Sequence, residues 1–242
     1  MDKRNVLIIW DDYYHPEANY REAVRKSFDE SNKWNVTKTH RIRELFTMQP
    51  RPELCIVFTV GCPEGEDNLN TEEQNQVKKM VEEGMGMLFI HAGLACIEDN
   101  TPLFEIAKGR FASHPEPHYD VYCTRLPGSS HPVMEKIEPF VTADEHYFCR
   151  VDIENVTPLM VGVSDAGTEI AGWAHTLGKG RVCCLTPGHN HPMLIKMRPL
   201  MENAADWCAS SKVENFEAKY VSNIELMSAE ADKGYKDEAD NL

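Results

Sequence analysis

The sequence predicts an α/β fold in one domain, built on a mainly parallel central sheet. Three apolar runs, at 6–10, 54–58 and 85–90, are typical of strands that are buried on both faces. A helical pattern between the second and third runs supplies the crossover that parallel strands need. The length of 242 residues and the hydrophobic content of 42% suit one large domain with a substantial core.

The N-terminal quarter alternates strands with helices. The strand at 6–10 precedes a helix that Pro16 can begin, because proline fits the first helical turn. A weaker pattern predicts another strand at 36–40. The strand at 54–58 is expected to stop before Gly61-Cys62-Pro63.

The next helix has the clearest boundaries. Thr71-Glu72-Glu73-Gln74 fits a capping box, in which the first and fourth residues satisfy each other's backbone amides. Val77 and Val81 lie on its apolar stripe, and Gly84 ends it. The run at 85–90 is then the third strong strand.

The middle of the chain, from 101 to 171, has a different character. Short β-like segments at 119–123, 147–151 and 159–163 alternate with Pro, Gly and Asp turns. We expect these segments to be antiparallel additions to the same sheet and not a second domain.

The last strong strand is predicted at 181–186, after a tight hairpin at Gly178-Lys179-Gly180. An amphipathic helix follows at 197–208. We therefore place an α/β domain at 1–211 and an acidic, partly disordered extension at 212–242. The extension contains four Lys and eight Asp and Glu residues.

Composition narrows the class of partner. With 25 Lys and Arg against 39 Asp and Glu, the net charge of −14 argues against nucleic acid or an anionic membrane as partner. No apolar run approaches the ~20 residues of a membrane span. The eight cysteines form no CxxC pair. With no secretion signal, reduced thiols in the cytoplasm are expected.

Three histidines follow three predicted parallel strands. His15 comes after the first strand, His91 follows the third directly, and His189 follows the last. Ligands of an open parallel sheet bind beyond the carboxyl ends of its strands, where these side chains can converge. Imidazole suits both proton transfer near neutral pH and the binding of transition metals.

The sequence around His91 resembles a nucleophile elbow, a sharp strand-to-helix turn that exposes one side chain. In Phe89-Ile90-His91-Ala92-Gly93 the exposed position is a histidine, which is a poorer covalent nucleophile than a thiolate. Cys96 lies five residues further on, too far to be the elbow residue.

The middle and late segments add further candidates. Asp144-Glu145-His146-Tyr147 places two carboxylates where either can act as a base or orient a histidine, although a solvated turn is the commoner outcome. His114 lies in a His-Pro turn, and Trp173 and His175 precede the hairpin. Trp173 can offer an apolar face to a sugar, although buried Trp is the default. His40 and His118 are given no role.

A divalent metal, most simply zinc, is a further hypothesis. A catalytic zinc needs three protein ligands and an open position, and the nominated ligands are His15, His91, Glu145 and His189. No HxH or HxxxH pair on a predicted helix supports the metal, so a metal-free acid–base site stays the first choice.

These motifs occur together, in order, in one known family. From about Val6 to Ser210 the sequence resembles the ThuA family, linked to trehalose utilisation, in Ile90-His91-Ala92-Gly93, Phe111…His114-Pro115, His131-Pro132-Val133, Asp144-Glu145…Tyr147, Gly178-Lys179-Gly180-Arg181-Val182 and Gly188-His189-Asn190. The resemblance implies a flavodoxin-like three-layer sandwich, similar to the class I glutamine amidotransferase domain. Because His91 stands where the amidotransferase cysteine would be, glutamine hydrolysis is not expected.

The resemblance also implies a substrate class, since ThuA-like proteins accompany sugar dehydrogenases that make 3-keto glycosides. We expect acid–base chemistry on a keto sugar or oxidised disaccharide by an isomerase, lyase or hydrolase. The expected catalytic residues are His91, Glu145 and His189, and the expected substrate-binding residues are His15, His114, Asp144, Tyr147, Trp173 and His175. The alternative is a non-catalytic module that binds a sugar or a protein. The expected partner is a small carbohydrate, and assembly into a homo-oligomer is a further possibility.

Overall fold

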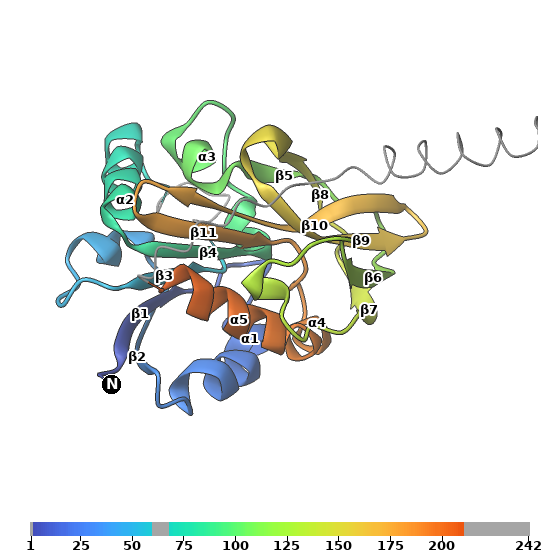
Figure 1. Ribbon diagram of the computed structural model, residues 1–242, viewed down its shortest axis with the longest axis horizontal. Coiled ribbons are helices and arrows are strands. Elements are labelled where there is room, and N and C mark those ends of the chain that lie inside the picture. The colour runs from blue at the N-terminus through green and yellow to red at the C-terminus, as the bar shows by residue number, and fades with distance from the viewer. Residues whose placement is uncertain (1, 60–67, 211–242) are drawn as a thin grey trace, which may run out of the picture.

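The computed structural model describes residues 2–59 and 68–210. A mixed nine-stranded sheet forms its centre, in the order β2-β1-β3-β4-β11-β10-β9-β6-β7, with helices on both faces (Figure 1). The predicted α/β class is therefore confirmed. The proposed boundary at 211/212 and the acidic extension lie outside the described residues.

The parallel half of the sheet contains the three strong strands as neighbours. β1 (Arg4–Ile9) lies between β2 (Trp34–Thr39) and β3 (Leu54–Val57), and β3 pairs with β4 (Gly86–Ile90). All of these pairs are parallel, and β11 (Gly180–Leu185) continues the parallel set beside β4. The prediction from continuous apolar character is confirmed, since every residue of β3, β4 and β11 is buried.

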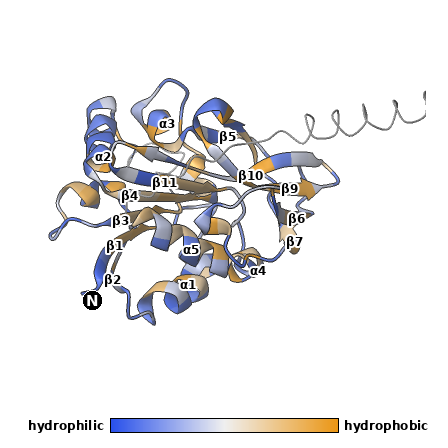
Figure 2. Ribbon diagram, viewed as in Figure 1, coloured by the Kyte–Doolittle hydropathy of each residue, from blue (hydrophilic) through white to orange (hydrophobic). Residues whose placement is uncertain are grey.

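Alternate residues of these strands pack into two separate cores. Val6 and Ile8 of β1 pack on one face, and Leu7 and Ile9 pack on the other, as the two-residue period of a strand requires. Figure 2 shows the hydrophobic strands at the centre and the hydrophilic outer side of α2. The first core is covered by α1 (Glu17–Val24), α4 (His191–Lys196) and α5 (Arg198–Cys208), and the second by α2 (Thr71–Glu83) and α3 (Pro102–Ala107).

The capping box of α2 lies one residue earlier than the sequence pattern predicts. Asn70 is the N-cap: its side chain accepts from the backbone N–H of Glu73, whose carboxylate accepts from the N–H of Asn70. Thr71 is the first helical residue instead of the cap. Asn and Thr both serve as caps, so the pattern alone did not fix the register. Gly84 ends the helix as predicted, with φ +128°.

The antiparallel half of the sheet comes from the middle segment. β10 (Gly167–Leu177) forms the predicted hairpin with β11, and β9 (Thr157–Ser164), β6 (Tyr119–Arg125) and β7 (Phe140–Asp144) follow outward. Two of the three predicted additions therefore join the main sheet.

The third predicted addition does not join the main sheet. β8 (Phe148–Val151) pairs with β5 (Gly109–Ser113) in a separate two-stranded sheet. β5 follows α3 directly, and its edge pairs with β8 outside the nine-stranded sheet. Such pairing between distant segments leaves no local signal in the sequence.

Short helical turns complete the chain, and none of the helices in the described ranges is long and apolar enough to cross a bilayer. A π-helical turn at Arg25–Asp29 extends α1, and 3₁₀ turns lie at Ile42–Phe46, His91–Leu94, Pro132–Met134 and Ile153–Asn155.

Candidate functional site

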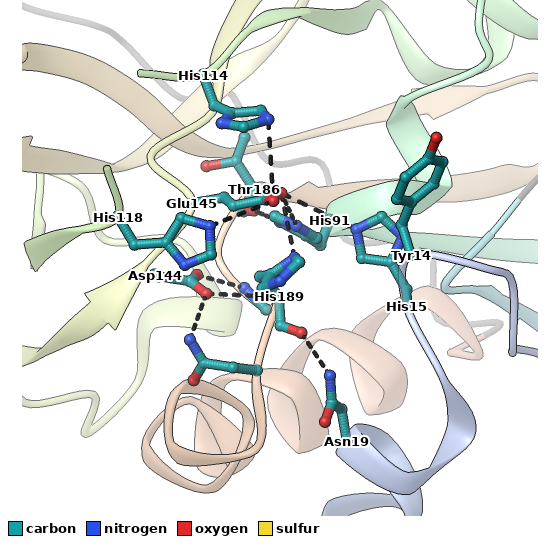
Figure 3. A network of polar contacts seen from close by, with 12 residues as sticks. Tyr14, His15, Asn19, His91, His114, His118, Asp144, Glu145, Thr186 and His189 are labelled. Carbon is teal, nitrogen blue, oxygen red and sulfur yellow. Dashed lines mark hydrogen bonds and ion pairs between the residues drawn. The ribbon is translucent and has the colours of Figure 1, made fainter. Parts of the chain in front are cut away.

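Four side chains converge at one edge of the sheet. One ligand atom from each of His15, His91, Glu145 and His189 can be chosen so that all four atoms lie within 4.8 Å of one another (Figure 3). The structure thus brings together the four residues that were nominated from the sequence as possible metal ligands.

Strand direction explains this convergence. His15, His91 and His189 follow β1, β4 and β11, which run parallel. From β11 to β7 there are four antiparallel pairings, so β7 points the same way as β11 and delivers Glu145 to the same edge.

The sheet must also curl to close the site. Four strand spacings separate β7 from β11, or about 19 Å in a flat sheet. Nevertheless, Asp144 at the end of β7 accepts from the backbone N–H of Gly188 at 2.8 Å and of His189 at 3.0 Å. The β9–β10 pairing contains register shifts around Gly172, and irregularities of this kind bend a sheet.

His91 is the most constrained of the four residues. It begins the turn after β4 with φ +48°, and its ring is wholly buried against Tyr147, with ring centroids 3.8 Å apart. Its Nδ1 lies 2.7 Å from the carbonyl oxygen of Thr186, which can only accept a hydrogen bond. Nδ1 therefore carries the proton. Burial lowers the pKa of His91 to about 4 against the opposing hydrogen bond to Glu145, and the charge of His15 lowers it further, so the ring is neutral at pH 7.

The neutral tautomer leaves a lone pair on Nε2 of His91. That nitrogen lies 3.2 Å from Oε2 of Glu145. Burial alone would raise the pKa of Glu145, but the surrounding histidines outweigh burial and hold the pKa well below its usual range. Two acceptors thus face each other at short range, an arrangement that requires a positive group between or beside them.

His15 is oriented by a carboxylate. Asp12 accepts from Nδ1 of His15, with its two oxygens at 2.9 and 3.2 Å. The opposite nitrogen, Nε2, lies 3.9 Å from Oε2 of Glu145 and has no hydrogen-bond partner among the described residues. Burial lowers the pKa of His15, but Asp12 and Glu145 together raise it to about 9.

His189 is oriented through its backbone. Asp144 binds its N–H, and Asn19 donates to its carbonyl oxygen at 3.1 Å. The Nδ1 atom of His189 is buried 3.1 Å from Oε2 of Glu145, without hydrogen-bond geometry to any described residue. His189 thus contributes a second nitrogen that is directed into the cluster without a partner.

Glu145 separates an inner from an outer set of histidines. Its Oε2 faces the inner rings of His15, His91 and His189, as described above. Its Oε1 lies 3.5 Å from Nε2 of His118 and 3.8 Å from Nε2 of His114. The side chains of His114 and His118 are 25% and 38% exposed, so the outer set lies toward solvent.

Asp144 and Tyr147, expected to bind substrate, support the cluster from behind. Asp144 is wholly buried and holds the 188–190 segment, since Asn190 also donates to it at 3.2 Å. Burial raises the pKa of Asp144 to about 7, against the opposing hydrogen bonds from Gly188 and His189. Tyr147 is 3% exposed and packs its ring on His91. Neither side chain offers a surface to a ligand.

The structure does not bring Trp173 and His175 to the cluster. Trp173 is 0% exposed in the second core, and its Nε1 donates to the carbonyl oxygen of Ala107 at 2.8 Å. His175 donates from Nε2 to the carbonyl oxygen of Ile106 at 2.9 Å, and burial lowers its pKa to about 4. A sugar has no access to the Trp173 ring, so the expected stacking on it is corrected.

Sequence reasoning missed three contributors to the site. His118 was given no role, although it lies as close to Glu145 as His114 does. Asp12 and Thr186 orient the inner rings, and neither was chosen as a site residue. The spacing Asp12-x-x-His15 was the available signal for one of them, because a short turn allows that side-chain contact.

The donor set could hold a divalent metal. Three imidazole nitrogens and one carboxylate oxygen match zinc and other first-row transition metals. The partners of the far nitrogens, Asp12 for His15 and Thr186 for His91, are the acceptors that commonly orient metal-bound histidines.

Comparison with known proteins gives a family and a fold. The family model for ThuA, described as trehalose utilisation, matches residues 5–208. A ThuA-like protein from Parabacteroides merdae has a similar structure, with 16% identity and a TM-score of 0.67, covering 90% of this chain and 94% of that one. A ThuA-like protein from Bacteroides uniformis gives 17% identity and a TM-score of 0.65, covering 85% and 91%.

A wider likeness extends to larger proteins. A β-galactosidase from Rahnella sp. R3 gives 12% identity and a TM-score of 0.57, covering 83% of this chain and 31% of that one. No match was found among proteins of curated function. At these identities the structural likenesses establish the fold alone.

Proposed function

Because the chain belongs to the ThuA family, a family described by trehalose utilisation, we propose that it is a carbohydrate-processing enzyme whose His/Glu cluster binds a divalent metal and acts on a keto sugar. The family description suggests a carbohydrate-related role. The metal, the keto sugar and the reaction are the proposal. The partner is a small-molecule carbohydrate, and the location is the cytoplasm, where the thiols of the described cysteines would stay reduced.

One observation carries the metal proposal: Nε2 of neutral His91 faces the ionised Oε2 of Glu145 at 3.2 Å. Beside this pair lie Nε2 of His15 and Nδ1 of His189, both buried and both without a hydrogen-bond partner in the described chain. Buried acceptors that face one another cost free energy unless a cation joins them. A divalent ion at this point would join the two acceptors and take the nitrogens of His15 and His189 as further ligands.

Zinc is the ion that this set fits best, with His15, His91, His189 and Glu145 as the ligands. When bound, it would act as a Lewis acid that polarises a sugar carbonyl. His15 would have to lose a proton on binding, because Asp12 and Glu145 raise its pKa to about 9.

The substrate chemistry follows from the ketone. A carbonyl at C3 of a sugar acidifies the C2 proton, because the electron pair left on C2 delocalises to the C3 oxygen as an enolate. The outer histidines, His114 and His118, are the candidate proton carriers, since they are partly exposed and lie beside Oε1 of Glu145. The buried rings of His15 and His91 exclude water from the other side of the site.

The enolate can react in two ways, by isomerisation or by elimination. In isomerisation, C3 gains a proton while the hydroxyl proton on the C2 oxygen moves to the C3 oxygen, so the carbonyl moves to C2. In elimination, the electron pair forms a C1–C2 double bond, and the C1–O bond breaks. The leaving alkoxide then takes a proton from a histidine. Addition of water to the unsaturated product would complete a net hydrolysis.

The test combines metal analysis with turnover of 3-keto-trehalose. Protein purified without an affinity tag is assayed as isolated, after chelation and after zinc is added back. Mass spectrometry follows cleavage and deuterium uptake at C2 from D₂O. We expect about one zinc per chain, and activity that is lost on chelation and returns with the metal. His191→Gln is the matched control, since His191 is an exposed neighbour that pairs with Glu22.

A metal-free acid–base site is the second candidate, and the high pKa of His15 favours it. Protonated His15 beside ionised Glu145 already balances the charge of the cluster without an ion. Full activity in metal-free protein would end the metal proposal, and loss of that activity in Glu145→Gln would then support acid–base chemistry. No change in any of a broad panel of 3-keto glucosides would indicate a binding module instead of an enzyme.

A further inference from the structure

Two tyrosines next to the cluster are more exposed than any other large apolar side chain in the described residues. Tyr13 is 83% exposed and Tyr14 is 58% exposed, whereas the next, Ile153, is 48% exposed. Both lie in the segment between β1 and α1 that carries His15. Large aromatic rings are usually buried, so a rigid exposed pair beside a polar cluster needs an explanation.

The backbone that carries these rings is fixed. One oxygen of Asp12 accepts from the N–H groups of Tyr14 and His15, each at 2.8 Å, and the N–H of Asp12 donates to the carbonyl oxygen of His15 at 3.2 Å. The carboxylate of Asp11 accepts from the N–H of Glu17 at 2.7 Å, which joins the turn to the first residue of α1. The rings therefore project from an ordered turn into solvent.

The Tyr14 ring adjoins the cluster directly. Its centroid lies 6.5 Å from that of His15, whose ring lies 5.2 Å from His91. In Figure 3, Tyr14 lies to the right of Glu145, His118 lies to its left, and His114 lies above it. Tyr13 packs edge-on against Tyr14, with centroids 4.9 Å apart, and restricts the positions that the Tyr14 ring can take.

We propose that Tyr14 is a stacking platform for a pyranose ring of the substrate, positioned so that an adjoining sugar unit reaches the His/Glu cluster. The inference rests on the proposed carbohydrate substrate and deepens it, because it assigns a place to a second sugar unit. One face of a pyranose presents C–H groups, which pack on an aromatic ring while the hydroxyls stay in water. The exposed, pre-ordered Tyr14 ring fits such a ligand, since little conformational freedom is lost when it binds.

The experiment compares Tyr14→Ala and Tyr14→Phe with Tyr122→Ala. Tyr122 is 43% exposed on β6, so its removal controls for the loss of an exposed tyrosine ring. Steady-state kinetics with 3-keto-trehalose give KM and kcat, and calorimetry with trehalose gives a Kd that needs no turnover. We expect Tyr14→Ala to raise KM and Kd about tenfold with kcat within about twofold. Tyr14→Phe keeps the ring and should stay within about threefold of the wild type.

The outcomes separate this inference from the proposed function. Trehalose binding that weakens in Tyr14→Ala, without turnover of any keto sugar by the wild type, supports the platform and refutes the enzyme. Turnover with an unchanged KM in Tyr14→Ala refutes the platform and leaves the enzyme. An equal loss in Tyr122→Ala, or no sugar binding by the wild type, also refutes the platform. The zinc content of Tyr14→Ala must equal that of the wild type, so that damage to His15 is not mistaken for lost stacking.

Discussion

Asp12 binds Nδ1 of His15 with oxygens at 2.9 and 3.2 Å and thereby turns the opposite nitrogen of the ring toward Glu145. The same carboxylate fixes the backbone of the turn, since it also accepts from the N–H groups of Tyr14 and His15. One side chain thus sets the orientation of a histidine ring in the cluster and the position of the exposed aromatic ring beside it.

We expect Asp12→Asn to weaken zinc binding by about 10- to 100-fold, the usual effect of removing the carboxylate partner of a metal-bound histidine. Competition with a chromophoric chelator measures the change. Asp11→Asn is the matched control, because its carboxylate caps Glu17 and approaches His40 instead of His15. Equal zinc affinity in wild type and Asp12→Asn would show that His15 is not a ligand.

Zinc binding should strengthen as pH rises. The net effect of Asp12 and Glu145 against burial raises the pKa of His15 to about 9, so zinc must displace a proton from it at pH 7. We expect the zinc association constant to rise about tenfold per pH unit between pH 7 and 9 and to level off above that range. Unbuffered titrations should release about one proton per zinc at pH 7. A pH-independent affinity over this range would contradict the assignment.

The same residue should give the metal-free protein a stability that depends on pH. The pKa of His15 is about 9 in the folded chain and about 6.5 in an unfolded one. The folded state therefore holds the proton more tightly, and this stability is complete below pH 6.5 and is lost as pH rises through 9. Denaturant unfolding of chelated wild type and His15→Gln should show the pH-dependent difference, which zinc should abolish.

The fold and part of the site could be predicted from the sequence, because both depend on patterns that are local in the chain. Continuous apolar runs mark strands buried on both faces, and the carboxyl ends of parallel strands meet at one edge, so His15, His91 and His189 were identified together. Glu145 was nominated by residue type, but its arrival depends on the direction of β7 and on a curled sheet. The position of His118 beside Glu145 depends on the same bending of the sheet, which no local sequence pattern predicts.

The Trp173 ring shows a second limit. Its strand pattern is the same whether the ring faces solvent or the second core, and only the packing of α3 against the sheet decides. We expect Trp173→Phe to destabilise the fold by about 2–4 kcal/mol, because it leaves a cavity and removes the hydrogen bond to Ala107. Sugar binding by the folded variant should be unchanged. Chemical denaturation and calorimetry with trehalose test the two parts separately.

The position of the α2 N-cap at Asn70 predicts which of two neighbouring substitutions lowers the stability of the fold. Asn70→Ala removes the side chain that binds the N–H of Glu73 and should destabilise the fold by about 1 kcal/mol. Thr71→Ala is the control, because Thr71 is the first helical residue and alanine is favourable there. If Thr71→Ala loses more unfolding free energy than Asn70→Ala, Thr71 is the N-cap, as the sequence pattern suggests.

Gly93 allows the turn that carries His91 to pack closely against β3. A Cβ built on Gly93 would lie 2.1 Å from the carbonyl oxygen of Val57 at the end of β3, a distance no real contact tolerates. Gly93→Ala must therefore push the His91 turn away from β3. We expect a loss of about 3 kcal/mol or more in the free energy of unfolding.

Zinc binding separates this effect from a general loss of stability. His91 lies two residues before Gly93, so moving the turn should also weaken zinc binding in the fraction that still folds. Gly128→Ala is the control: its Cβ meets nothing within 4 Å, and its φ of +80° adds only the ~1–2 kcal/mol strain of a left-handed residue. If Gly93→Ala is no less stable than Gly128→Ala and binds zinc like the wild type, the turn does not depend on this close approach. The position of His91 would then be set by its contacts with Thr186 and Tyr147 alone.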